Sequence, residues 1–150
     1  MGLGIVFMGQ YQHSIDAKGR LSIPAKFRCA LGEEFVITQG LDNCLFVYPM
    51  KEWQALEAKL QKLSFTKAKA RAFSRLFFSG AEVAEMDKLG RALVAGHLRE
   101  FAHLDKDVMV IGVGSRIEIW DKAAWSGYKE ETTADYAAIA EELNDFDIDL

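Results

Sequence analysis

Short apolar runs, rich in β-branched residues, recur in the same order in the two halves of this chain. In the first half they cover residues 35–37 and 45–48, and in the second half they cover residues 108–110 and 117–120. Gly and acidic residues bound the runs at 35–37 and 108–110, and short runs of this composition predict β-strands. The pattern therefore predicts one strand-rich unit that is present twice.

A charged turn precedes the strands in each half. It consists of an Asp, then a Gly three residues later, and then an Arg. An Asp side chain accepts hydrogen bonds from nearby backbone amides, and Gly readily takes a positive φ, so the Arg leaves the turn pointing outward. The two turns are Asp16-Ala17-Lys18-Gly19-Arg20 and Asp87-Lys88-Leu89-Gly90-Arg91.

The repeat continues beyond the turns. Trp53 has its counterpart in Trp125, and Arg28 has its counterpart in Arg99. Each half is expected to run strand, Arg turn, strand, short helix, strand, strand, helix. Arg28 and Arg99 fall on the short helices, where we expect structural ion pairs, with phosphate contact as the alternative. Two halves of this size are marginal on their own, so we expect them to share one core.

Helical spacing dominates between the two halves. Apolar residues recur at intervals of three and four over residues 53–63 and again over residues 72–77, which predicts two helices. Ser64 or Thr66 is expected to cap the second helix. The stretch is also basic, since Glu57 is opposed by Lys59, Lys62, Lys67, Lys69, Arg71 and Arg75. A solvated helix face and a face toward phosphate both fit this charge.

The C-terminal segment, residues 129–150, is acidic, with eight Asp and Glu side chains against one Lys. Within it, Tyr136, Ile139 and Leu143 recur at helical spacing. We expect a short amphipathic helix that packs against the rest of the chain or has a mild regulatory role.

Three segments of the sequence resemble the MraZ family of bacterial transcriptional regulators. They are residues 14–24, 86–91 and 117–120, and the resemblance extends over roughly residues 8–128. The family is built from two domains of the AbrB/SpoVT type. The resemblance therefore implies an α+β fold, with two tandem swapped-hairpin β-barrel repeats forming an intramolecular pseudo-dimer, and with peripheral helices. The family usually has Pro near the start of the short helix in the second half, where this chain has Gly96.

The expected domain organisation has four parts. Residues 8–56 form the first AbrB/SpoVT-like domain, and residues 57–79 form a basic helical connector. Residues 80–128 form the second AbrB/SpoVT-like domain, and residues 129–150 form the acidic C-terminal tail.

Few residues of the sequence suit catalysis or metal binding. Cys29 and Cys44 show no CxxC spacing and no companion pair, so we expect two reduced, semi-buried thiols and not a zinc site. His13 and Ser14 are neighbours in a predicted strand and point to opposite faces, which does not suit a hydrolase. No nucleophile motif, phosphate loop or cluster of metal ligands is present in the sequence. We therefore expect no enzyme activity, no cofactor and no metal.

The chain lacks the sequence signals of a membrane protein. No apolar stretch is long enough to cross a bilayer, and residues 1–7 lack the basic start and the apolar length of a signal peptide. We expect a cytoplasmic protein that is associated with the nucleoid and has no membrane partner. The repeat pattern begins just after Met8, so Met8 is an alternative to Met1 as the first residue.

The distribution of charge supports DNA binding, although the net charge does not. The formal net charge is -4, but the chain outside the acidic tail has more basic than acidic residues. Arg bonds O6 and N7 of guanine together in the major groove, whereas Lys acts as a simpler charge toward phosphate. A salt bridge between each Arg and the Asp of its own turn is the structural alternative. We expect double-stranded DNA to contact Arg20, Arg91, Lys18 and Lys88, while Asp16, Gly19, Asp87 and Gly90 form the turns.

The resemblance also implies an assembly and a target. MraZ-like proteins form closed rings, so the resemblance implies a ring-shaped homo-oligomer. In such a ring many weak contacts to one DNA molecule act at high effective concentration. The implied targets are short, G-containing direct repeats in the promoter of the operon for cell division and cell-wall synthesis, which includes the regulator's own gene. Two other functions stay open. One is a protein-interaction ring that does not bind DNA, and the other is an antitoxin-like protein that captures a toxin.

Overall fold

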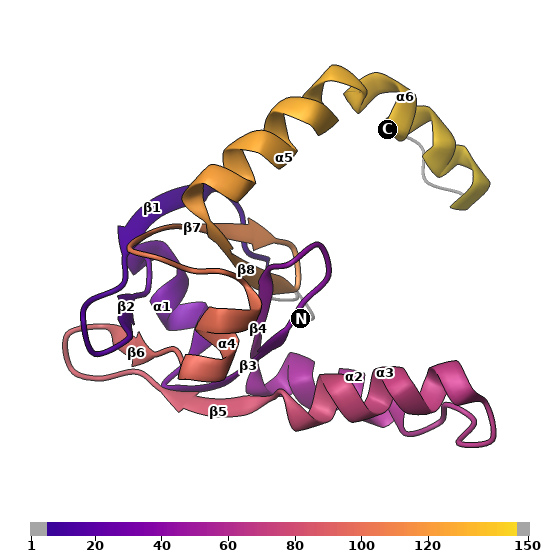
Figure 1. Ribbon diagram of the computed structural model, residues 1–150, viewed down its shortest axis with the longest axis horizontal. Helices are drawn as coiled ribbons and strands as arrows, with labels where there is room; N and C mark the ends of the chain where they lie inside the picture. Colours follow the sequence, from indigo (N-terminus) through magenta and orange to yellow (C-terminus); the bar gives the residue numbers. More distant parts are fainter. Residues whose placement is uncertain (1–5, 147–150) are drawn as a thin grey trace.

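The α+β fold expected from the sequence is confirmed by the computed structural model, which describes residues 6–146 (Figure 1). The first repeat contains β1 (Gln10–Ser14), β2 (Arg20–Ser22), α1 (Ala25–Leu31), β3 (Glu34–Gln39), β4 (Leu45–Pro49) and α2 (Met50–Leu60), and it is followed by α3 (Ala68–Ser79). The second repeat contains β5 (Glu82–Glu85), β6 (Arg91–Leu93), α4 (Gly96–Phe101), β7 (Asp107–Val113), β8 (Arg116–Asp121) and α5 (Lys122–Ala134), and it is followed by α6 (Tyr136–Glu142) and a 3-10 helix (Leu143–Phe146).

The two repeats exchange strands within one antiparallel sheet. Its strand order is β1-β7-β8-β4-β3-β5, and a separate two-stranded ribbon pairs β2 with β6. The first strand of each repeat therefore pairs with a strand of the other repeat, β1 with β7 and β5 with β3. Neither repeat keeps a complete sheet of its own, which is the arrangement expected of an intramolecular pseudo-dimer.

Both repeats contribute to the core inside the curved sheet. Leu21 and Phe35 from the first repeat and Leu98 and Ile117 from the second are almost completely buried in it. Phe7 precedes the first strand and packs edge-on against Phe27, with their ring centroids 5.5 Å apart. Burying a side chain of this kind contributes about 1.5–3 kcal/mol to folding. The shared core thus fixes how the two repeats lie relative to each other.

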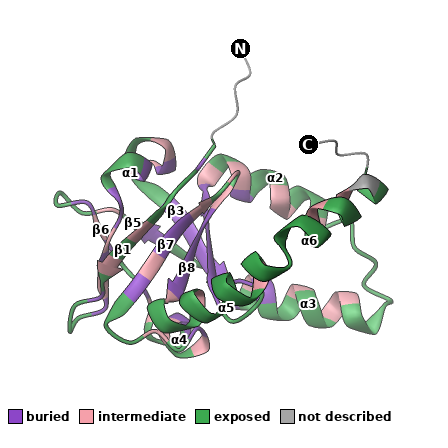
Figure 2. Cartoon of the chain, turned by 90° about the horizontal axis from the view of Figure 1, so that it is seen from above, coloured by how far each residue is buried: buried purple, intermediate pink, exposed green. Residues whose placement is uncertain are grey.

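Aromatic side chains cover the outer face of the sheet. Trp53 of α2 stacks on Phe77 of α3 with ring centroids 5.6 Å apart, and Trp125 of α5 packs on Trp120 of β8 at 5.2 Å. The buried Thr38 hydroxyl donates to the carbonyl oxygen of Phe77 at 2.7 Å, which fastens the end of α3 to the sheet. These contacts hold α2, α3 and the start of α5 against β3, β4 and β8 (Figure 2).

Both predicted connector helices are present, but the second does not begin with the predicted cap. The first ends at Leu60, and the second begins at Ala68 after Lys67, whose side chain makes no capping hydrogen bond. The predicted cap by Ser64 or Thr66 is wrong, because these two hydroxyls lie 2.7 Å apart and bond to each other. The hydroxyls stabilise the loop between the helices instead of the helix end.

The short helix of the second repeat begins in the same way as the short helix of the first. The residue before α1 is Pro24, with φ of -50°, and the residue before α4 is Ala95, with φ of -56°. Ala95 and not Gly96 is therefore the structural counterpart of Pro24. The buried Leu98 anchors α4 in the core, so the helix begins at this place without Pro.

The C-terminal helices leave the sheet at a different side from the connector helices (Figure 1). No described residue of α6 is buried, so the packed tail expected from the sequence is absent from the single chain, and residues 147–150 of that tail lie outside the described residues. Within residues 6–146, none of the helices combines the length and the apolar character that crossing a bilayer requires.

Candidate nucleic-acid interface

The first Arg turn is closed by the side chain of Asp16. Its Oδ1 atom accepts hydrogen bonds from the backbone amides of Lys18 and Arg20, both at 2.9 Å. The amide of Gly19 donates to the carbonyl oxygen of Asp16 at 3.0 Å, and Gly19 has a φ of +87°. Residues other than Gly adopt this backbone conformation only with strain, so the turn requires both its Asp and its Gly.

The second Arg turn repeats this geometry. Oδ1 of Asp87 accepts from the amides of Leu89 at 2.9 Å and Arg91 at 2.8 Å. The amide of Gly90 donates to the carbonyl oxygen of Asp87 at 3.0 Å, and the φ of Gly90 is +79°. Two stretches of sequence with different central residues therefore form the same turn.

Each turn holds its Arg side chain by one nitrogen only. Nε of Arg20 donates to Oδ2 of Asp16 at 2.7 Å, and Nε of Arg91 donates to Oδ2 of Asp87 at 2.9 Å. These are the salt bridges considered as the structural alternative. Among residues 6–146, however, Nη1 and Nη2 of both arginines donate a hydrogen bond to no protein group. The bridge thus orients each guanidinium and leaves a pair of donors available.

The same contacts lower the pKa of both carboxyl groups below the usual Asp value. The main cause is the hydrogen bond from the backbone amide of Arg20 to Asp16 and from that of Arg91 to Asp87. The hydrogen bonds from the two guanidinium groups lower these pKa values further. Both carboxylates are therefore charged, and can orient an Arg, throughout the neutral pH range.

The two arginines lie on one face of the ribbon formed by β2 and β6. Arg20 pairs with Leu93, and Arg91 pairs with Ser22, in an antiparallel register. Paired residues share a face, so Arg20 and Arg91 are diagonal neighbours about 7–8 Å apart at the backbone. Leu21 and Ala92 occupy the opposite face and are buried in the core. Both turns lie at one end of the molecule, at the left of Figure 1, away from α3 and α6.

Arg28 and Arg99 support the turns across the boundary between the repeats. Nε of Arg99 donates to the carbonyl oxygen of Val94 at 2.9 Å, and a Cβ atom placed on Gly19 would lie 3.0 Å from the Cζ atom of Arg99. In the same way, Nε of Arg28 donates to the carbonyl oxygen of Ile23 at 2.8 Å. A Cβ atom on Gly90 would overlap the guanidinium group of Arg28.

The predicted role of Arg28 and Arg99 in ion pairs is therefore wrong for the described part of the chain. Backbone hydrogen bonds reinforce the crossing, since the amide of Ile23 donates to Gly90 at 2.8 Å and the amide of Val94 donates to Gly19 at 2.9 Å. Arg28 follows Arg20 at the same spacing as Arg99 follows Arg91, which indicates that Arg28 and Arg99 are equivalent residues of the two repeats. It does not reveal that each Arg supports the turn of the other repeat.

The lysines predicted to contact phosphate occupy different positions in the two turns. Lys18 and Lys88 are both exposed. The counterpart of Lys18 is the exposed Leu89, however, and the counterpart of Lys88 is Ala17. The two turns thus share the position of the Arg and differ in the chemistry of their tips.

The remaining residues considered for chemistry do not form a second site. His13 and Ser14 differ in burial along β1, in agreement with their pointing to opposite faces. Cys29 and Cys44 are both free thiols, but neither is semi-buried as predicted, since Cys29 is exposed and Cys44 is buried. In the part of the chain that the structure describes, no three His, Cys, Asp or Glu side chains are grouped as metal ligands.

These features define a protein of two interleaved repeats that presents a pair of Arg turns on one ribbon. The family model described as "MraZ protein, putative antitoxin-like" matches the chain twice, over residues 6–76 and 77–147. The chain belongs to the MraZ family, which confirms the resemblance noted in the sequence.

Curated relatives match almost the whole chain. The proteins called "Transcriptional regulator MraZ" from Moorella thermoacetica and Heliobacterium modesticaldum are each 59% identical to it over 143 residues, which is 95% of this chain and 100% of either relative. The protein of the same name from Natranaerobius thermophilus is 53% identical over 143 residues, with the same coverage. These names describe regulators of transcription and not a class of enzyme.

Proposed function

We propose that this protein is a sequence-specific, DNA-binding regulator of transcription that acts at the nucleoid in the cytoplasm. The observation that carries the proposal is the ribbon of β2 and β6, where Arg20 and Arg91 share one face and each has Nη1 and Nη2 free of protein partners within the described chain. The name given to the curated relatives supports a role in transcription.

The proposed contact of the ribbon is with the major groove of DNA. The groove admits an α-helix or a two-stranded β-ribbon, and Arg is the side chain that most often bonds guanine there. With Nε held by Asp16 or Asp87, the two terminal nitrogens of each Arg are oriented to donate to O6 and N7 of one guanine. Each such pair of bonds discriminates against a wrong base by about 1–3 kcal/mol. Lys18 and Lys88 add charge toward the phosphates on either side.

One chain offers only two such contacts, so we propose a ring-shaped homo-oligomer that binds several sites at once. The targets proposed are short, G-containing direct repeats in the promoter of the operon for cell division and cell-wall synthesis, which includes the protein's own gene. Simultaneous binding raises the overall affinity because the second and later contacts form at high effective concentration.

The proposal is tested by competition binding with the DNA upstream of the protein's own gene. A duplex from this region should bind more tightly than a shuffled duplex of the same composition, by about a thousandfold or more at one fixed salt concentration. Inserting about 5 bp between two repeats turns the second repeat to the other side of the helix, since one turn takes roughly 10 bp. Most of the gain from simultaneous binding should then be lost, and an insertion of about 10 bp should restore part of it.

The same experiment separates the alternatives. Equal affinity for the specific and the shuffled duplex would overturn sequence-specific recognition, and equal affinity for the three spacings would mean that each subunit binds independently. An assembled protein without any salt-sensitive binding to DNA would favour a protein-interaction ring. An antitoxin-like protein would instead bind a partner protein through a segment outside the ribbon, and its affinity for DNA would change when that partner is added.

A further inference from the structure

The outer face of the ribbon formed by β2 and β6 differs between its two halves. Arg20 pairs with Leu93, whereas Arg91 pairs with Ser22. Leu93 and Ser22 are equivalent positions of the two repeats, since each lies two residues after the Arg of its own turn. Each Arg therefore has a neighbour from the other repeat across the ribbon, and this neighbour is apolar beside Arg20 and polar beside Arg91.

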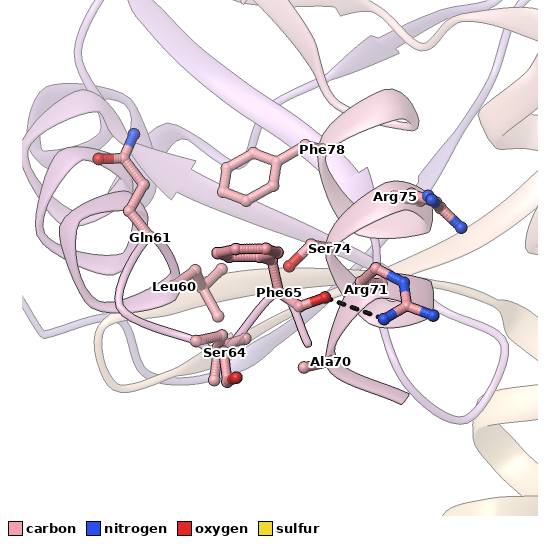
Figure 3. A pocket seen from close by; sticks show the side chains of 10 residues that line it. Leu60, Gln61, Ser64, Phe65, Ala70, Arg71, Ser74, Arg75 and Phe78 are labelled. Atoms are coloured by element: carbon pink, nitrogen blue, oxygen red, sulfur yellow. Dashed lines mark hydrogen bonds between the residues drawn. The ribbon is translucent and has the colours of Figure 1, made fainter. Parts of the chain in front are cut away.

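Leu93 is an exposed apolar side chain on a polar face. It is 57% exposed, whereas Leu21 and Ala92 on the opposite face of the ribbon are buried. A separate group of apolar side chains lies at the far end of the molecule, where the 81% exposed Phe65 lies beside Leu60 in the groove between α2 and α3 (Figure 3). Leu93 lies at the Arg turns instead, so the group that covers it belongs to a molecule bound at the ribbon.

The surroundings of Leu93 disfavour phosphate as the group that covers it. Leu93 and Val83 line one hollow of about 510 Å³, and Val83 is 62% exposed, so the two side chains leave each other largely uncovered. Glu82 and Glu85 line the same hollow, and their negative charges repel the DNA backbone. The DNA group that suits this position is therefore an apolar group on a base.

Thymine offers such a group in the major groove. Of the four bases, thymine alone presents a methyl group there. Leu93 has no hydrogen-bonding group, so a base whose donor faced it would lose its bond to water without a replacement. Ser22 has a hydroxyl that both donates and accepts, and it can therefore contact any of the bases.

We propose that Leu93 contacts the methyl group of a thymine near the guanine bonded by Arg20, and that Ser22 makes no such demand beside Arg91. Directly paired residues of a ribbon have Cβ atoms about 4.5–5.5 Å apart, and successive bases of one strand are about 3.4 Å apart. The thymine is therefore roughly one or two base pairs from the guanine.

This difference gives each chain a direction on the DNA. Two identical halves would bind a site equally well in both orientations, because a twofold arrangement of the protein matches a palindromic site. With Leu93 in one half and Ser22 in the other, one orientation is favoured. The inference rests on the proposed function and adds a second base to the one that Arg20 contacts.

The contact is tested with duplexes that lack single methyl groups. Each thymine near a guanine in the upstream DNA is replaced in turn by deoxyuridine, which removes the methyl group and keeps the base pair. At one fixed position in the repeats the replacement should weaken binding of wild-type protein by about fourfold for each repeat changed, the effect of one buried methyl group. The competition is measured at one salt concentration.

Variants of the ribbon identify the side chain that makes the contact. Leu93→Ser should bind the thymine and the deoxyuridine duplex equally, whereas Leu93→Met keeps an apolar side chain and should still favour thymine. Leu89→Ser is the control, because Leu89 is an exposed apolar residue at the tip of the second turn, and it should favour thymine as wild type does. Ser22→Leu should create a second methyl-dependent position, near the guanine of Arg91. Circular dichroism checks that each variant is folded.

Arg20→Ala separates this inference from the proposed function. If Arg20→Ala weakens binding while wild type binds the thymine duplex and every deoxyuridine duplex equally, the methyl contact does not exist and the inference alone fails. It also fails if Leu93→Ser still favours thymine, since another side chain then makes the contact. If Leu93→Ser binds the thymine duplex as tightly as wild type, Leu93 does not touch DNA and a protein partner covers it. If neither Arg20→Ala nor any deoxyuridine changes the affinity, the proposed recognition by the Arg turns fails as well.

Discussion

The two Arg turns have the same hydrogen bonds but differ at their tips and in the closeness of their support. Asp16 and Asp87 bind their turns in the same way, whereas exposed Lys18 in the first turn corresponds to exposed Leu89 in the second. The guanidinium of Arg28 also approaches Gly90 more closely than that of Arg99 approaches Gly19. The Asp and Gly that orient each Arg are thus the same in both turns, whereas the residue at the tip and the closeness of the supporting Arg differ.

The shared features of the two turns should matter more for DNA binding than the features in which they differ. Arg20 and Arg91 have equivalent positions and should contribute equally, whereas the tips should contribute unequally.

Removing the arginines should have the largest effect. Arg20→Ala and Arg91→Ala should each weaken binding to the specific duplex by about 1–3 kcal/mol per engaged site, because two bonds to guanine are lost. Fluorescence anisotropy at one salt concentration measures the change, with Lys122→Ala on α5 as the control. Unchanged affinity of both variants, with oligomer mass and circular dichroism also unchanged, would show that the turns do not contact the bases.

Replacing the turn glycines should come next and should be unequal. Gly19→Val and Gly90→Val both force a β-branched residue to a positive φ, at a cost of about 1–3 kcal/mol. Gly90→Val should weaken DNA binding more, because the new side chain also displaces Arg28 from Ile23. Gly32→Val is the matched control, since Gly32 has a φ of +84° and open space around it. Equal losses at positions 19 and 90 would show that the closeness of the supporting Arg has no effect.

Removing the supporting arginines should have a smaller, crossed effect. Arg28→Met should disturb the second turn, and Arg99→Met should disturb the first. Each variant loses one hydrogen bond that contributes about 1 kcal/mol to the stability of the protein, so its affinity for DNA should fall by at most roughly fivefold. Changes in the amide resonances of Gly19 and Gly90 in NMR spectra identify the turn that moves. A change confined to the turn of the same repeat would contradict the crossed arrangement.

Exchanging the tips should have the smallest effect. Lys18→Leu should reduce the dependence of log affinity on log salt by about 0.9, the value for one phosphate contact. Leu89→Lys should increase it by a similar amount, because the second turn then has the same tip residue as the first. Affinities measured from low to moderate salt give the slope, and equal slopes for both variants and wild type would show that the tips do not reach the phosphates.

The sequence was informative about the turns because their bonds are local. Asp16 bonds to Lys18 and Arg20, which are at most four residues away, so the order of residue types nearly determines the geometry. The strands and the α+β class followed from short apolar runs that occur twice. The predicted capping by Ser64 or Thr66 failed because these hydroxyls had each other as nearer partners.

Contacts between distant segments could be known only from the tertiary structure. Arg28 lies beneath Gly90 because the repeats exchange strands and share a core, and nothing near Arg28 in the sequence records this. The exposure of the apolar face of α6 could not be predicted from the sequence either, because helical spacing shows that a helix has an apolar face but does not show what covers it. By itself the sequence determined the repeat, and it determined the Arg turns because their hydrogen bonds join residues only a few positions apart. The tertiary structure alone decided how the two turns support each other and which surfaces remain open, because these depend on how the whole chain packs.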